Sequence, residues 1–89
     1  MSDAALPQID FATFILSLSH SALMHLGDAP HPEDNAQRVS LAMAKQTIDL
    51  LGLLEEKTKG NLSGEEERLI TQILFDLRMR FVEKSKSEK

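Results

Sequence analysis

The stretch that decides the fold runs from Val39 to Asn61 and reads V-S-L-A-M-A-K-Q-T-I-D-L-L-G-L-L-E-E-K-T-K-G-N. At about 100° per residue, its apolar side chains predict one long helix with a wide apolar surface. A first stripe holds Ala36, Val39, Met43, Leu50 and Leu54, and its two flanks hold Leu41, Ala44, Ile48 and Leu51 on one side and Ala42 and Leu53 on the other. Only a narrow wedge is polar, at Arg38, Lys45, Asp49 and Glu56. We therefore expect this helix to be central, with neighbours on two or three sides.

Length, charge and cysteine content limit the class of protein. A chain of 89 residues fits one small domain, in which a single copy buries only about 60 to 65% of its extended surface. The absence of cysteine excludes disulfides and thiolate zinc sites and predicts a cytoplasmic protein. The net charge of -4 argues against a nucleic-acid partner. Because no apolar run is long enough for a membrane span and residues 1–9 do not resemble a signal peptide, we expect no membrane segment.

A second helix is predicted before the central one. Asp10 suits an N-cap, the apolar positions from Phe11 to Leu26 follow a helical period, and Gly27 suits the left-handed residue that ends a helix. The main stripe of this helix comprises Phe11, Phe14, Ile15, Leu18, Ala22 and Leu26. A separate patch of Ala12, Leu16 and Leu23 lies about 120° away. One neighbouring helix cannot cover both surfaces.

The two following helices are bounded by further signals. Pro32 suits the first position of the central helix, where Glu33 and Asp34 would place negative charge at its positive end. We expect that helix to reach about Thr58, with Gly60 as its left-handed cap. Ser63 to Glu66 form a capping box that begins a third helix. Its main stripe holds Leu69, Ile70, Ile73, Leu74, Leu77 and Phe81, and a second patch on the opposite side holds Phe75, Met79 and Val82.

These elements predict an all-α protein with three helices. The short turn after the central helix favours an antiparallel hairpin with helix three, and helix one is expected to pack across it. We predict a flexible arm at 1–9, a three-helix domain at 10–83 and a disordered tail at 84–89. Asp49 is expected either to pair with Lys45 on the helix surface or to meet Arg78 across the hairpin.

Several segments resemble an uncharacterised bacterial family of short all-helical proteins, domain of unknown function 1844. They are F-A-T-F-I-L-S-L at Phe11 to Leu18, A-K-Q-T-I-D-L-L-G-L-L-E-E-K-T-K-G-N-L at Ala44 to Leu62, and the E-E-E-R-L-I and D-L-R-M-R-F-V segments of helix three. K-T-K-G-N-L is the most specific part. The resemblance implies a small cytosolic helical protein and supplies no activity, substrate or catalytic residue.

The three histidines do not have the spacing of a metal site. His20 and His25 are five residues apart and diverge by about 140° on a helix, which is unfavourable for a metal site, and His31 lies in the linker. We predict no metal, no cofactor, no catalytic residue and no enzymatic activity, because no nucleophile and base or phosphate-binding motif is present.

An anion site is conceivable at the turn, where Lys57, Lys59, Gly60 and Asn61 precede the amides of helix three. The competing interpretation is that Gly60, Ser63 and Glu66 are caps and the lysines are solvated, and the acids around the turn favour it.

The two extra apolar patches carry the functional prediction. Ala12, Leu16 and Leu23 on helix one, and Phe75, Met79 and Val82 on helix three, exceed what a single three-helix unit can bury. We expect a protein interaction module that forms a homodimer or higher homo-oligomer through these residues. The alternative is an adaptor whose apolar faces bind a different protein.

Overall fold

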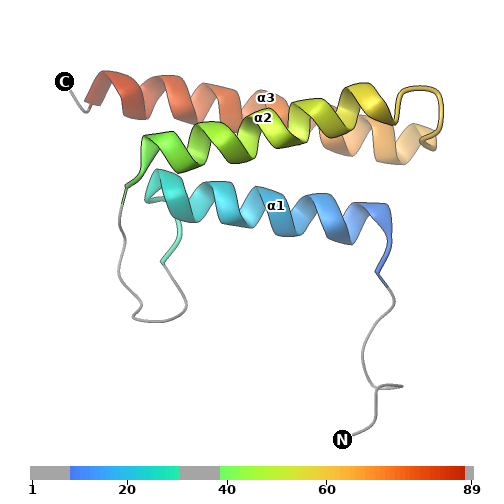
Figure 1. Cartoon of the computed structure of the whole chain (residues 1–89), viewed down its shortest axis with the longest axis horizontal. Helices are drawn as coiled ribbons and strands as arrows, with labels where there is room; N and C mark the ends of the chain where they lie inside the picture. Colours follow the sequence, from blue (N-terminus) through green and yellow to red (C-terminus); the bar gives the residue numbers. More distant parts are fainter. Residues whose placement is uncertain (1–8, 31–38, 88–89) are drawn as a thin grey trace, which may run out of the picture.

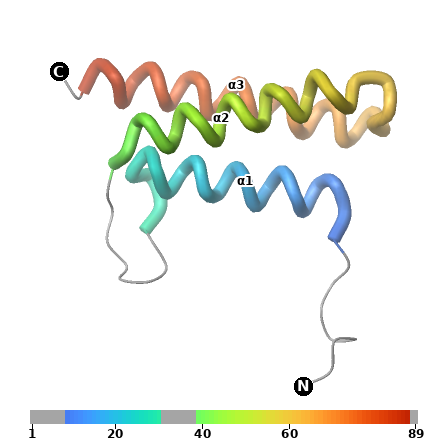
Figure 2. Tube along the Cα trace, in the orientation of Figure 1, coloured from blue at the N-terminus to red at the C-terminus, as the bar shows by residue number. Residues whose placement is uncertain are grey.

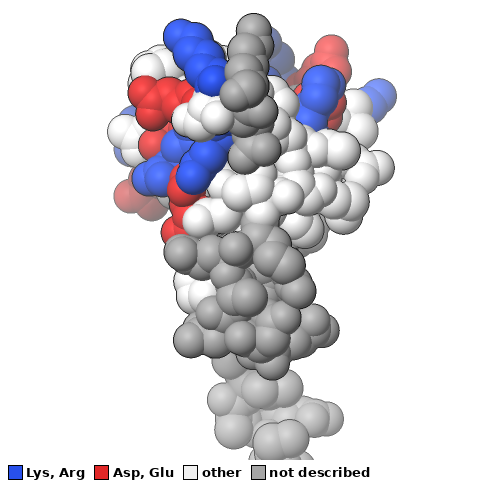
Figure 3. Space-filling view, turned by 90° about the vertical axis from the view of Figure 1, so that its left-hand side faces the viewer, with Lys and Arg blue, Asp and Glu red and all other residues white. Residues whose placement is uncertain are grey.

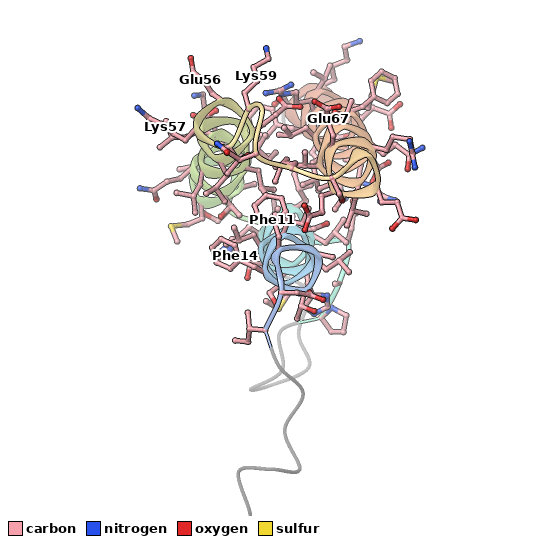
Figure 4. All side chains as sticks on the ribbon, turned by 90° about the vertical axis from the view of Figure 1, so that its right-hand side faces the viewer. Phe11, Phe14, Glu56, Lys57, Lys59 and Glu67 are labelled. Atoms are coloured by element: carbon pink, nitrogen blue, oxygen red, sulfur yellow. The ribbon has the colours of Figure 1, made fainter. Side chains whose placement is uncertain are left out.

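The computed structural model describes residues 9–30 and 39–87, which form three helices. They are α1 (Phe11–Leu26), α2 (Leu41–Lys57) and α3 (Gly64–Ser87). α1 and α2 run in opposite directions, as do α2 and α3, so α1 and α3 run the same way (Figures 1 and 2). Each helix contacts the other two, and viewed along their axes they form a triangle (Figure 4). The predicted all-α class and the hairpin of the second and third helices are confirmed.

The ends of α1 are closed as the sequence predicts. The Asp10 carboxylate accepts a hydrogen bond of 2.8 Å from the Thr13 N–H. At the other end Gly27 adopts a left-handed conformation with φ 83°. The N–H groups of Gly27 and Asp28 donate to the carbonyls of Met24 and Leu23, at 3.1 and 2.9 Å. This is the paired bonding of a Schellman motif, and it satisfies carbonyls that the helix leaves free.

The start of α2 corrects the prediction. We expected the helix to begin at Pro32, but Val39 and Ser40 are not helical and the first helical residue is Leu41. Ser40 is the N-cap, with an extended backbone and a side chain that accepts from the Met43 N–H at 3.4 Å. A serine directly before the apolar run, in the N-cap position, was a stronger signal for the start of the helix than the proline. Pro32, with Glu33 and Asp34, lies outside the described residues.

The turn between α2 and α3 is built from two caps. α2 ends at Lys57, the cap residue is Thr58, and Gly60 follows with the predicted positive φ of 86°. The capping box is confirmed: the Ser63 N–H donates to Glu66 Oε1 at 2.9 Å, and the Glu66 N–H donates to Ser63 Oγ at 3.1 Å. These bonds fix the direction in which α3 leaves the turn.

α3 is longer than predicted. We expected the ordered domain to end at residue 83, whereas the helix continues to Ser87. The Lys84 ammonium lies 3.2 Å from a carboxylate oxygen of Asp28, and the Ser87 hydroxyl donates to the Glu83 carbonyl at 3.1 Å. The ion pair with Asp28, two residues beyond the end of α1, thus adds a tertiary contact to a segment that has no apolar residue of its own.

The core takes three buried side chains from each helix. They are Ile15, Ala22 and Leu26 of α1, Ala44, Ile48 and Leu51 of α2, and Ile70, Leu74 and Leu77 of α3. A second layer of half-buried apolar residues packs against them, including Phe11 at one end and Phe81 at the other. The predicted main stripe of α3 is therefore the core stripe of that helix.

The buried side of α2 differs from the predicted one. Ala44, Ile48 and Leu51, predicted as one flank of the apolar arc, are the most buried positions. Met43 and Leu50 of the predicted first stripe stay 46% and 44% exposed. Met43 and Leu50 stay exposed because the apolar side chains of α2 cover more than half of its circumference, and α1 and α3 can bury only part of that surface.

Candidate functional site

The outward surface of α3 carries the two most exposed large apolar side chains of the three helices, Phe75 and Met79. Phe75, Met79 and Val82, hereafter the α3 face, are 68%, 53% and 50% exposed. They lie on the side of α3 opposite its buried residues, as the helical period predicts. The predicted second patch of this helix is thus open to solvent within the chain.

A shallow hollow of about 360 Å³ lies beside the α3 face, between α2 and α3. Its walls are mainly apolar, with Leu74 below the three residues of the face and Arg78 at the edge. The Thr71 hydroxyl donates to Glu55 at 3.2 Å across this groove, which joins the two helices above the core. The hollow has the size of a few apolar side chains, and its polar lining comes from Glu55, Thr71 and Arg78.

The predicted patch on α1 is only partly available. Leu16 is 51% exposed, but Leu23 packs against the core and Ala12 is half-buried. The patch is therefore reduced to a single open side chain. The triangular packing explains the difference, because α1 contacts α3 as well as α2 and so uses both sides of its apolar surface.

Sequence reasoning missed a second face, shared by α1 and α2. Phe14, Met43, Leu50 and Leu53, together with Val39 just before α2, are 42 to 49% exposed and are called the α1/α2 face. In Figure 4, Phe14 lies on the side of α1 nearest α2. Seen from the end where α2 begins, the surface on the α2 side is broadly uncharged, and charged side chains gather on the other side (Figure 3). The spacing of Met43, Gln46, Leu50 and Leu53 by three and four residues could have revealed this stripe.

The turn offers an anion few free donors. The Asn61 N–H already donates to the Thr58 carbonyl at 2.9 Å, and the Ser63 N–H is held by Glu66. Lys59 borders an open hollow that is also lined by Glu55, Glu56 and Glu67, whereas Lys57 is not part of it. Figure 4 shows the two lysine side chains pointing in different directions. Lys57, Lys59, Gly60 and Asn61 do not form one pocket, and anion binding there stays a prediction that the carboxylates oppose.

Histidines and carboxylates do not assemble a metal site in the described ranges, where no group of three potential ligands is close enough. His20 is exposed and His25 is half-buried, and His31 lies outside those ranges. In the same part of the chain, no helix has the length and apolarity needed to cross a bilayer.

A charged cluster joins the end of α1 to α3. Asp28 accepts from Arg80 at 3.1 Å and pairs with Lys84 at 3.2 Å, while Arg80 also contacts Asp76 at 2.8 Å. The carboxylates of Asp76 and, second, Asp28 raise the pKa of the Arg80 guanidinium above its ordinary value. Of the two predicted partners for Asp49, the structure shows Lys45 at 2.8 Å and no bond to Arg78. The two pairs of Asp28 connect the segment after α1 to α3.

The fold and its surfaces define a class, a small three-helix domain with a buried apolar core and open apolar faces. The chain belongs to the family described as Domain of unknown function (DUF1844), whose model matches residues 8–83. The family resemblance noted from the sequence is thereby confirmed. No curated protein and no solved structure matches the chain.

Proposed function

We propose that this protein is a self-associating helical interaction module, forming a homodimer or a higher homo-oligomer through its exposed apolar faces. The α3 face is the observation that carries the proposal. Phe75 is 68% exposed although the nine-residue core beneath it is closed. Because nothing within the described chain covers this face, an external surface is needed to remove it from water.

The apolar area of the α3 face sets the expected free energy of association. Complete burial of a large apolar side chain contributes about 1.5 to 3 kcal/mol, and the side chains of the α3 face are already about half covered. Six of them, three from each of two copies, compete with an association cost of about 4 to 15 kcal/mol. The remaining burial gives about 5 to 9 kcal/mol in all, which is of the same size as that cost, so we expect the α3 face to support weak association that depends on a high protein concentration.

Light scattering coupled to size exclusion, over a range of concentrations, tests the proposal. We expect the native chain to give a mass above one copy, and Phe75→Glu/Met79→Glu to give a folded monomer. His20→Glu is the matched control, because it adds a charge at an exposed position of α1 outside both faces. A native chain that is a folded monomer at every concentration overturns the proposal.

A second candidate is an adaptor that also binds a different protein. The observation in its favour is that the α3 face and the α1/α2 face are separate, so one can remain open when the other is occupied. Leu50→Glu/Leu53→Glu should then leave the homo-oligomer intact and abolish capture of the other protein. Loss of self-association in this variant would instead assign the α1/α2 face to the homo-oligomer.

A further inference from the structure

We infer that two copies meet through their α3 faces with the two α3 helices parallel, and that Arg78 of each copy pairs with the partner's Glu83. The inference rests on the proposed self-association and names its geometry and the charges that select it. The occupant of the α3 face is thus a second copy of this chain.

The spacing along α3 fits a helix-to-helix seam. Phe75, Met79 and Val82 are separated by four and three residues, the alternation that keeps side chains facing a partner helix. Gln72 and Lys86 continue the same spacing at the two ends and are exposed. The apolar centre of the seam therefore has a polar residue at each end, and this limits how far one α3 helix can shift along the other.

Charges of opposite sign border the seam on its two edges. Arg78 precedes Met79 and Glu83 follows Val82, which puts them on opposite sides of the apolar row. Neither side chain has an ion-pair partner within the part of the chain that the structure describes. The other charges nearby, on Asp76, Arg80 and Lys84, are engaged in the cluster around Asp28. Arg78 and Glu83 are therefore available to a partner.

Only the parallel orientation brings these two charges together. In a parallel pair, a residue on the edge that holds Arg78 faces the opposite edge of the other copy, at the residue five positions later in the sequence. Each Arg78 therefore meets the partner's Glu83. In an antiparallel pair, each edge faces the same edge of the partner. Asp76 and Glu83 share one edge, so that arrangement opposes acid to acid, and Arg78 gains no carboxylate.

The surroundings of Arg78 are compatible with this role. Its guanidinium lies against Gly52 of α2, since a Cβ at Gly52 would be 3.1 Å from Arg78 Nη2. The side chain is exposed and borders the hollow beside Phe75. An apolar side chain of a second copy can occupy that hollow while Arg78 remains at the rim, where it reaches across to the partner. The α1/α2 face has no such complementary pair of edges, because Asp49 and Glu56 on one side of its row meet neutral residues on the other.

A charge-exchange experiment tests the inference with the full-length chain. Arg78→Glu and Glu83→Arg, each alone, place like charges opposite each other in a parallel pair, and we expect about tenfold weaker association. Mixed one to one, the two variants recreate both attractions, so native mass spectrometry should show the heterodimer in excess over either homodimer. Lys59→Glu and Glu56→Arg form the control pair, since both positions are exposed and lie away from the α3 face.

A second measurement reports the orientation directly. The chain contains no cysteine, so Lys86→Cys introduces a single thiol at the end of the seam. A parallel pair brings the two thiols together, and mild oxidation should give a covalent dimer. Two results would overturn the parallel pairing. One is a mixture of Arg78→Glu and Glu83→Arg chains in which the heterodimer is no more abundant than either homodimer. The other is a disulfide that forms only between Gln72→Cys and Lys86→Cys chains. In either result the native chain still associates, whereas a native monomer overturns the proposed function itself.

Discussion

At the scale of single residues, Gly52 is a helix-interior glycine that contacts a side chain of another helix. Glycine in the interior of a helix costs stability because its unfolded backbone is unusually free. Here it lies in the middle of α2, where the guanidinium of Arg78 approaches from α3. The helical pattern alone gives no reason for a glycine at this position, and only the fold shows that Arg78 lies beside it.

Gly52→Ala should raise the free energy of unfolding by about 0.5 to 1 kcal/mol, because the added methyl meets only the far end of a flexible side chain. Gly60→Ala is the contrasting variant. Nothing lies within 4 Å of its added carbon, but φ is +86°, so we expect a loss of about 1 to 2 kcal/mol. Urea unfolding followed by circular dichroism measures both. A destabilised Gly52→Ala chain would mean that Arg78 cannot move aside.

At the scale of helices, the ends were more predictable than the buried surfaces. The helix caps bond to backbone groups only a few residues away, so the sequence alone predicts them. They are Asp10, Gly27 and the Ser63–Glu66 box. The start of α2 was missed because Pro32 and Ser40 are competing signals, and local rules do not rank them. Which half of the α2 surface is buried depends on where α1 and α3 lie, and no local pattern contains that information.

The N-cap of α1 predicts a pH dependence of stability. Hydrogen bonds from Thr13, through its side chain and its N–H, lower the pKa of Asp10 below the ordinary value of 3.8. Because the folded pKa is the lower one, the stabilisation is complete above about pH 3.8 and is lost as the pH falls through the folded pKa. Asp10→Ala should lower the melting temperature at neutral pH and reduce its decline in acid.

Asp10→Asn separates the cap from the charge, because asparagine also accepts the Thr13 N–H bond but does not titrate. We expect it to keep most of the stability at neutral pH and to lose the acid dependence. Thermal melts between pH 2 and 7 decide the matter. An unchanged acid decline in both variants would assign that decline to other carboxylates.

At the scale of the whole molecule, the packing depends on contacts between residues far apart in the chain. Asp28 and Arg80 are 52 residues apart, and their ion pair connects the segment after α1 to the last turns of α3. The spacing of four residues indicates a pair of Arg80 with Asp76 on the same helix but gives no sign of Asp28, and we expected residues 84–89 to lie outside the domain. The α1/α2 face was missed for the same reason, since its residues become a surface only once α3 takes the other side of α2.

Asp28→Ala should cost about 1 kcal/mol at low salt, because two partly screened ion pairs of 3.1 and 3.2 Å are lost together. The native chain should lose this advantage as salt is added, so the two unfolding curves should converge at about 1 M NaCl. Asp28→Asn, which keeps the shape without the charge, should behave like the alanine variant. Identical stabilities of native and variant chains at low salt would show that the cluster contributes nothing.

If the chain self-associates as proposed, the separation of the two apolar faces determines how large the assembly can become. A subunit with two independent docking sides has a valence of two, and if like sides pair with like, growth alternates between two kinds of junction and has no natural stop. Dilution would then dissolve the polymer in two stages, because the junctions differ in strength. A subunit mutated on one side only would act as a chain terminator, and adding it in small amounts would shorten the polymer without unfolding any copy.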